Sequence, residues 1–146
     1  MALPELNAAG DLPPGVYPTT MTALTTRFGG PSRQRAVVTG RLHRAYRLAR
    51  QTGYLDRFFV FGSYITARDA PNDVDVVLVM ADDFRLAACP AEAQLLFHHV
   101  AAQDQLGVSA FWIRPAMLMQ ESVESFINHW QHKRDGSLRG IVEVIA

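Results

Sequence analysis

The sequence predicts an α/β (or α+β) protein, in which helices flank a mixed β-sheet of about four to five strands. Short apolar runs rich in valine, isoleucine and phenylalanine recur along the chain and predict strands. Segments with apolar residues at helical spacing lie between them. With 146 residues, 49% of them hydrophobic, one domain with a substantial core is expected.

Residues 1–31 are expected to form an extended arm that packs on a core domain of residues 32–146. Five prolines and four glycines in this stretch oppose long helices. Apolar residues such as Leu12 and Phe28 allow the arm to lie against the core, and a short helix is expected over 20–28. A free tail is the alternative.

A long helix is predicted from Ser32 to about Thr52, followed by Gly53 as its C-terminal stop. Its apolar residues fall on one face at helical spacing. The opposite face carries Arg41, Arg44, Arg47 and Arg50. These arginines are interpreted as a solvated surface, with a phosphate- or RNA-binding surface as the alternative.

The remaining elements follow from apolar runs and from proline and glycine at their ends. Strands are predicted over 57–61, 73–80, 108–113 and 140–145, and helices over 91–106 and 116–129.

Composition excludes several classes of protein. The 14 basic and 14 acidic residues balance, so the overall charge indicates no polyanionic partner. The lone Cys89 excludes an intramolecular disulfide and a zinc-finger framework. Because neither a signal peptide nor a membrane-length apolar run is found, we expect a soluble cytoplasmic protein with no membrane partner.

One group of residues predicts a functional site. Gly62-Ser63 follows a predicted strand, and Asp73 and Asp75 stand at the start of the next strand. Residues two apart in a strand face the same way, so the two carboxylates share one face and repel each other. A divalent cation relieves that repulsion, and oxygen ligands suit Mg²⁺. Gly62 leaves the backbone bare and Ser63 offers a hydroxyl, which suits phosphate. For each motif alone there is a simpler alternative: Asp-x-Asp is only hydrated, and Gly-Ser is only a turn. The two motifs together favour a nucleoside triphosphate site.

These motifs, Phe-Val-Phe-Gly-Ser over 59–63 and Asn-Asp-Val-Asp-Val-Val-Leu over 72–78, resemble the signature of the nucleotidyltransferase superfamily related to DNA polymerase beta. That superfamily includes the minimal nucleotidyltransferases of bacterial toxin–antitoxin and defence pairs. Segments over 10–15, 71–75 and 130–142 also resemble a bacterial family of unknown function within it.

The resemblance implies a metal-dependent transfer of a nucleoside monophosphate from a triphosphate to a protein or RNA acceptor. Asp73 and Asp75 would bind Mg²⁺ or Mn²⁺, and Gly62 and Ser63 would bind phosphate. A toxin-like protein partner, an RNA acceptor or a second copy of the chain are the partners that it suggests.

Active members of this superfamily usually carry a third carboxylate on the next core strand, but the run over 108–113 contains no acid. Ser109 occupies an equivalent position. Glu143 is the candidate for the missing catalytic oxygen if its strand lies beside Asp75. The alternative function is a degenerate, inactive member that binds a nucleotide or a partner; a structural module with accidental acids is a third.

Overall fold

The computed structural model of the chain describes residues 2–146 and shows an α/β fold built on one five-stranded mixed sheet. Its strands are β1 (Val16–Thr20), β2 (Leu55–Phe61), β3 (Val74–Met80), β4 (Val108–Ile113) and β5 (Ile141–Ile145). Their order across the sheet is β1-β5-β2-β3-β4. The edge strands run parallel to their neighbours, and β2 runs antiparallel to both β5 and β3. The central position of β2 separates β5 from β3.

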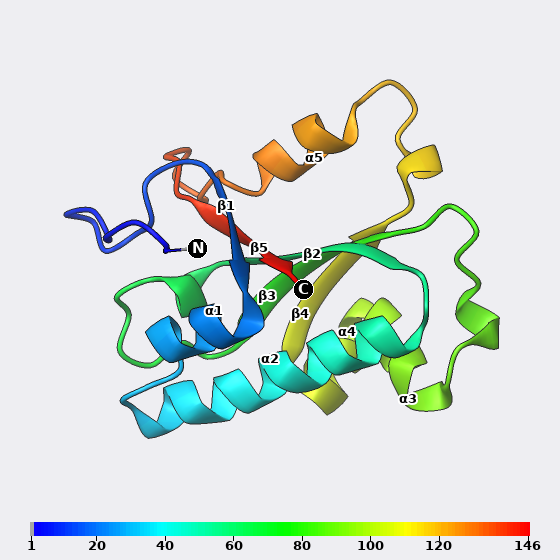
Figure 1. Cartoon of the computed structure of the whole chain (residues 1–146), viewed down its shortest axis with the longest axis horizontal. Helices are drawn as coiled ribbons and strands as arrows, with labels where there is room; N and C mark the ends of the chain where they lie inside the picture. The colour runs from blue at the N-terminus through cyan, green and yellow to red at the C-terminus, as the bar shows by residue number, and fades with distance from the viewer. Residues whose placement is uncertain (1) are drawn as a thin grey trace.

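Helices cover both faces of this sheet (Figure 1). One face packs against α1 (Met21–Phe28), α2 (Arg33–Gln51) and the helical turns over 91–106, and the other packs against α5 (Val123–His129). Strand residues alternate between these two cores, so Val74 and Val76 face α2 whereas Val77 faces α5. Among residues 2–146, no helix has both the length and the apolar character that crossing a bilayer requires.

Part of the predicted arm belongs to the sheet. The expected short helix is present as α1, with Thr20 as its N-cap, but residues 16–20 form β1, which pairs in parallel with β5. Pro18 lies within β1. Proline lacks an N–H donor and is tolerated at a sheet edge, which is where β1 lies.

The helix predicted over 91–106 is interrupted. His98 has extended dihedral angles, and the Phe97 carbonyl accepts a 3.0 Å hydrogen bond from Trp112 Nε1. This tertiary contact replaces a helical one, and the segment divides into α3 (Ala91–Gln94), η3 (Leu95–Phe97), α4 (His99–Ala101) and η4 (Ala102–Leu106, a π-helical turn). The helix predicted over 116–129 is likewise shorter, because α5 begins only after the N-cap Ser122. Three further 3₁₀ turns are η1 (Ser63–Ile65), η2 (Leu86–Ala88) and η5 (Pro115–Met117).

A buried arginine fixes the connection between β2 and β3 to α2. The Arg35 side chain, 5% exposed, donates hydrogen bonds of 2.5–3.0 Å to four backbone carbonyls. One acceptor is Phe28 at the end of α1, and the other three lie in the connection, at Tyr64, Thr66 and Arg68. A buried guanidinium requires such complete pairing, and these carbonyls supply it.

Three more α2-side contacts hold the later part of the same connection. Ser32 Oγ donates to the Asp69 carbonyl, and Gln34 Nε2 to the Pro71 carbonyl. Arg41 reaches the Asn72 carbonyl at 3.3 Å. The first half of α2 therefore determines the path of residues 64–72, which lead into Asp73.

Arg44, Arg47 and Arg50 of α2 have surface partners. Arg44 forms a 3.0 Å ion pair with Glu92, and the Arg50 guanidinium lies over the Tyr46 ring. These contacts suit a solvated surface, and RNA binding by this face stays a prediction.

Replacing Arg35 with methionine should lower the free energy of unfolding by at least about 2 kcal/mol, because three buried carbonyls and one part-buried carbonyl lose their donor. Urea denaturation followed by circular dichroism measures this change. The matched control is Arg33→Met, an exposed position two residues earlier in α2, which should change stability little. Equal stabilities of the two variants would contradict the proposed role of Arg35.

Candidate functional site

The predicted site residues meet where β2 ends and β3 begins. Asp75 lies opposite Phe61 in the β2–β3 register, and Ser109 of β4 lies opposite Asp75 on the other side. Gly62 and Ser63 follow β2 directly, whereas Asp73 directly precedes β3. The structure therefore brings Gly62, Ser63, Asp73 and Asp75 to one end of the sheet.

Gly62 is in direct contact with the Asp75 carboxylate. A Cβ built at Gly62 would overlap Asp75 Oδ2 and would lie 2.9 Å from its Cγ. The Gly62 backbone also has φ of +81°, a region that side chains disfavour. Only glycine allows the chain to turn here while the carboxylate rests against it.

Ser63 begins the turn η1 immediately after Gly62. Its carbonyl accepts hydrogen bonds from the Thr66 amide and hydroxyl, which close the turn. Its own hydroxyl is half-buried and has no hydrogen-bond partner among residues 2–146. The turn is thus fixed while the Ser63 hydroxyl remains available to a ligand.

Asp73 is oriented from β4. Ser109 Oγ lies 3.3 Å from Asp73 Oδ2 and donates to it, and it accepts a 3.0 Å hydrogen bond from Gln103 Nε2. Gln103 belongs to the π-helical turn η4, and such turns are frequent at functional sites. Ser109 therefore occupies the position at which a third carboxylate was expected, and it binds Asp73 as a neutral donor.

The two carboxylates create an electrostatic cost in the folded protein. Burial, followed by the negative charge of Asp73, raises the pKa of Asp75 to about 6. Arg139, the nearby Ser109 hydroxyl and Arg134 act in the opposite direction. Asp75 is consequently a carboxyl group for which an added cation would be favourable.

The donor set fits Mg²⁺ shared with a substrate. Within residues 2–146, no three histidine, cysteine or acidic side chains converge as a protein-only metal centre would require. Mg²⁺, however, is commonly held by one or two carboxylates together with substrate phosphates and water. Asp73 and Asp75, both half-buried, supply two such carboxylates at one end of the sheet.

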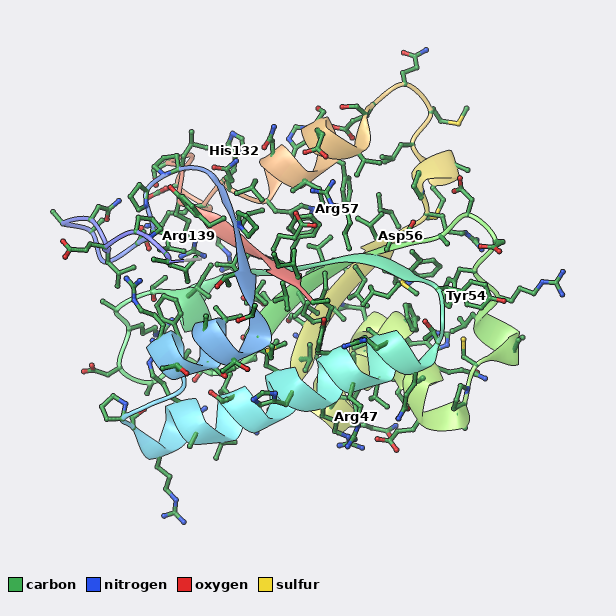
Figure 2. The ribbon with its side chains drawn as sticks, in the orientation of Figure 1. Arg47, Tyr54, Asp56, Arg57, His132 and Arg139 are labelled. Atoms are coloured by element: carbon green, nitrogen blue, oxygen red, sulfur yellow. The ribbon has the colours of Figure 1, made fainter. Side chains whose placement is uncertain are left out.

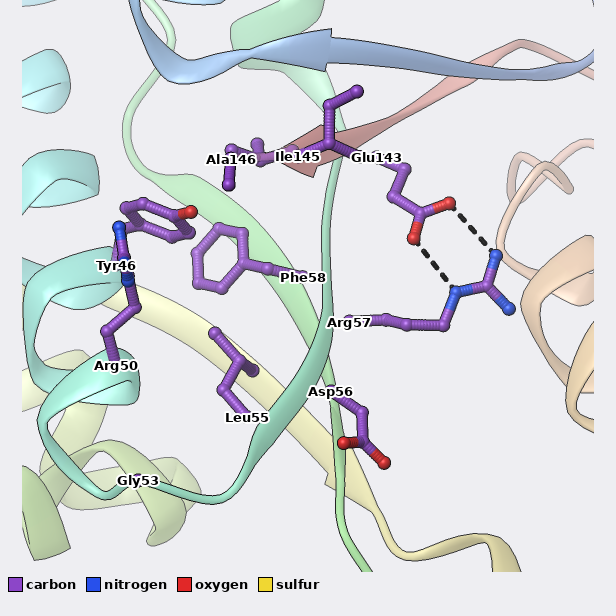
Figure 3. A pocket seen from close by; sticks show the side chains of 11 residues that line it. Tyr46, Arg50, Gly53, Leu55, Asp56, Arg57, Phe58, Glu143, Ile145 and Ala146 are labelled. Carbon is purple, nitrogen blue, oxygen red and sulfur yellow. Dashed lines mark hydrogen bonds and ion pairs between the residues drawn. The ribbon is translucent and has the colours of Figure 1, made fainter.

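The condition under which Glu143 would complete the site is not met, because its strand does not lie beside that of Asp75. Glu143 lies on the same sheet face as Asp75, but β2 separates their strands, and Glu143 pairs with Phe59 instead. Its carboxylate is bound by Arg57, with Nε–Oε2 and Nη2–Oε1 distances of 2.9 Å (Figure 3). This pair borders a separate cavity of about 440 Å³, so Glu143 supplies no oxygen beside Asp75. The periodicity of the sequence does not determine strand order, and the expectation depended on that order.

Composition and spacing did not predict a second charged group near Asp75, which consists of Asp11, Lys133 and Arg139. Asp11, 5% exposed, binds Lys133 Nζ at 2.9 Å, and Arg139 Nη1 lies 3.8 Å from its other oxygen. Figure 2 shows Arg139 and His132 at the opposite end of the molecule from Tyr54 and Asp56. Asp11 and Arg139 occur within segments that carry the narrower family resemblance, and that resemblance is the one signal that could have led to them.

Comparison with protein families matches residues 4–145 to DUF6932, a family of unknown function. The chain belongs to the DUF6932 family. No curated protein and no solved structure matches it. The matched residues include most of the N-terminal arm, Asp73 and Asp75, and the cations Lys133 and Arg139. The function of the family is unknown.

Gly62→Ala should destabilise the DUF6932 fold by about 1–3 kcal/mol, because the new Cβ meets the Asp75 carboxylate and the backbone has positive φ. In an Asp75→Ala background the same change should cost less, because the carboxylate is gone. Urea denaturation of the four proteins in this cycle measures the coupling. Strictly additive effects would show that Gly62 and Asp75 do not constrain each other.

Without metal, Asp75→Asn should raise thermal stability at neutral pH. A folded-state pKa of about 6, above the ordinary 3.8, means that the native state binds more protons across this window. Wild-type stability therefore falls as the pH rises from about 4 to about 6, whereas the variant lacks this loss. Melting temperatures between about pH 4 and pH 8 measure the difference, which should be small at the acid end and positive above the window. Asp56→Asn, an exposed position, is the control; the same pH trend in both variants would contradict the assignment to Asp75.

Proposed function

We propose that the chain is a metal-dependent nucleotidyltransferase, which transfers a nucleoside monophosphate from a nucleoside triphosphate to a protein or RNA acceptor. One observation carries this proposal: the Asp75 carboxylate rests against the bare backbone of Gly62, with Asp73 and the Ser63 hydroxyl at the same end of the sheet. Paired carboxylates beside a backbone turn that carries a serine hydroxyl suit a polyphosphate that arrives with its cation. The resemblance to minimal nucleotidyltransferases supports the same function.

In this function, each residue has a role that follows from its position. Ser63 would donate its hydroxyl to a phosphate oxygen, and Gly62 would let the Asp75 carboxylate pack against the turn that carries Ser63. Asp73 and Asp75 would hold the Mg²⁺ or Mn²⁺ ion, which supplies neutralisation of the phosphate charge. Ser109 and Gln103 would keep the Asp73 carboxylate oriented through their hydrogen bonds.

The transfer itself needs positioning more than covalent participation by the protein. An acceptor hydroxyl oxygen bonds to the α-phosphorus, the bond from that phosphorus to the bridging oxygen breaks, and pyrophosphate leaves. The hydroxyl proton passes to water, since Ser109 replaces the third carboxylate. We place the acceptor on a separate macromolecule, a toxin-like protein or an RNA, and the reaction in the cytoplasm.

A second candidate function is binding of a nucleotide or a partner without transfer. It is favoured by Ser109, which occupies the third-carboxylate position and contributes no negative charge there. The same two aspartates and the same Gly62-Ser63 turn would then bind the nucleotide, and only the transfer step would be missing.

Adding Mg²⁺ and a nucleoside triphosphate should stabilise the wild-type protein, by about 2.7 kcal/mol when the ligand exceeds its Kd by about a hundredfold. Asp73→Asn and Asp75→Asn should gain little, because each lacks a metal ligand. Thermal denaturation with each of the four nucleotides measures this binding. Incubation with α-³²P-labelled nucleotides and candidate protein or RNA acceptors measures the transfer.

Glu143→Gln is the matched control, because it changes a carboxylate on the same sheet face that Arg57 already binds. It should keep the nucleotide-dependent stabilisation. Labelled acceptor establishes transfer, whereas stabilisation without labelling favours the binding module. Equal shifts in wild type and both aspartate variants would exclude Asp73 and Asp75 as the metal ligands.

A further inference from the structure

The segment after α5 forms a tight hairpin over residues 131–139. His132 and Leu138 form a β-bridge, and the Arg139 amide donates to the Gln131 carbonyl at 2.8 Å. Asp135 Oδ1 accepts from both the amide and the hydroxyl of Ser137, which fixes the tip. The hairpin is exposed, yet its path is determined by its own hydrogen bonds.

The hairpin is attached beside the candidate site at both of its ends. Trp130, which precedes it, packs on Phe61 with ring centroids 4.8 Å apart, and Phe61 lies opposite Asp75 in the sheet. Asp11 binds Lys133 and lies near Arg139, as described above. These contacts place the 131–139 hairpin next to the carboxylates.

Gly10, the arm residue before Asp11, links the arm to the connection that begins with the Gly62-Ser63 turn. The Gly10 carbonyl accepts a 2.9 Å hydrogen bond from the Ala67 amide, shortly after Ser63 in the connection to β3. The hairpin, the arm and the Gly62-Ser63 turn are therefore one hydrogen-bonded unit.

Two arginines, Arg134 and Arg139, lie on the 131–139 hairpin. Arg139 is partly exposed and lies 3.8 Å from Asp11. Arg134 is exposed and makes no hydrogen bond or ion pair with any residue in the described range 2–146, although its charge acts on Asp75. Arg134 lies on a fixed turn near Asp73 and Asp75 and has no partner of its own within the described residues. It is therefore available to an anionic ligand.

We propose that Arg134, supported by Arg139, binds the polyphosphate chain of the incoming nucleotide beyond the α-phosphate. This inference rests on the proposed function. Two carboxylates repel a bare polyphosphate, so binding needs cations besides the one that Asp73 and Asp75 would hold. A guanidinium presents paired donors that match phosphate oxygens, and a charge-assisted hydrogen bond of this kind is strong. Arg134 would thereby select triphosphates over monophosphates.

Calorimetric titration of the full chain tests the proposal with three probes in Mg²⁺ buffer: nucleoside triphosphate, nucleoside monophosphate and inorganic tripolyphosphate. Arg134→Gln should weaken binding of triphosphate and tripolyphosphate about tenfold or more, since it removes a charge-assisted hydrogen bond. Monophosphate affinity should stay unchanged. Arg134→Lys should restore part of the loss, because the charge returns without the paired donors.

The matched control is Arg85→Gln, an exposed arginine beyond the far end of β3, which should bind all three probes as wild type does. Wild-type triphosphate affinity in Arg134→Gln would overturn the role of Arg134 while leaving the proposed function intact. Failure of the wild type to bind any nucleotide would overturn both. Loss of binding to a single-stranded RNA oligonucleotide, with unchanged tripolyphosphate affinity, would assign the hairpin to the acceptor and also overturn the proposal.

Discussion

Arg35 lies where the end of α1, the first turn of α2 and the connection between β2 and β3 meet, and its four hydrogen bonds join all three. Three of the carbonyls that it binds are in buried hydrogen bonds, and burying them unpaired would cost free energy. The connection carries Ser63 at its start and leads into Asp73, so the separation of the two motifs is fixed by this guanidinium rather than by the sheet alone. The geometry of the site depends first on a buried cation that never touches it.

Charged groups of both signs act on the Asp75 carboxylate. Asp73 and burial oppose its ionisation, whereas Arg139 and Arg134 favour it, and Asp11 holds Lys133 and Arg139 in turn. Residues from both terminal segments of the chain therefore set the electrostatic potential around two aspartates from its middle. Under the proposed function, these opposing charges would suit a ligand that brings opposite charges together, as a metal–polyphosphate complex does.

The sequence allowed the central part of the site to be predicted because the signals there are local. The two-residue period puts Asp73 and Asp75 on one face, and glycine after a strand marks a turn. Long-range arrangements were not predictable in the same way: the insertion of β2 between β5 and β3 moved Glu143 away from Asp75, and Trp112 interrupted a helix through the Phe97 carbonyl. The pairing of Arg35 with carbonyls likewise depends on contacts between segments distant in sequence, which helical periodicity does not report.

The parallel pairing of β1 with β5 joins the beginning of the described chain to its end. During synthesis, β1 emerges early and has no strand partner until β5 emerges, almost the whole chain later. The ion pairs of Asp11 likewise form only after Lys133 and Arg139 have been synthesised. Contacts this distant in sequence slow folding, because the intervening chain has to be ordered first. The cationic side of the site is consequently assembled last, so a nascent chain on the ribosome carries its aspartates before it carries the groups that balance them.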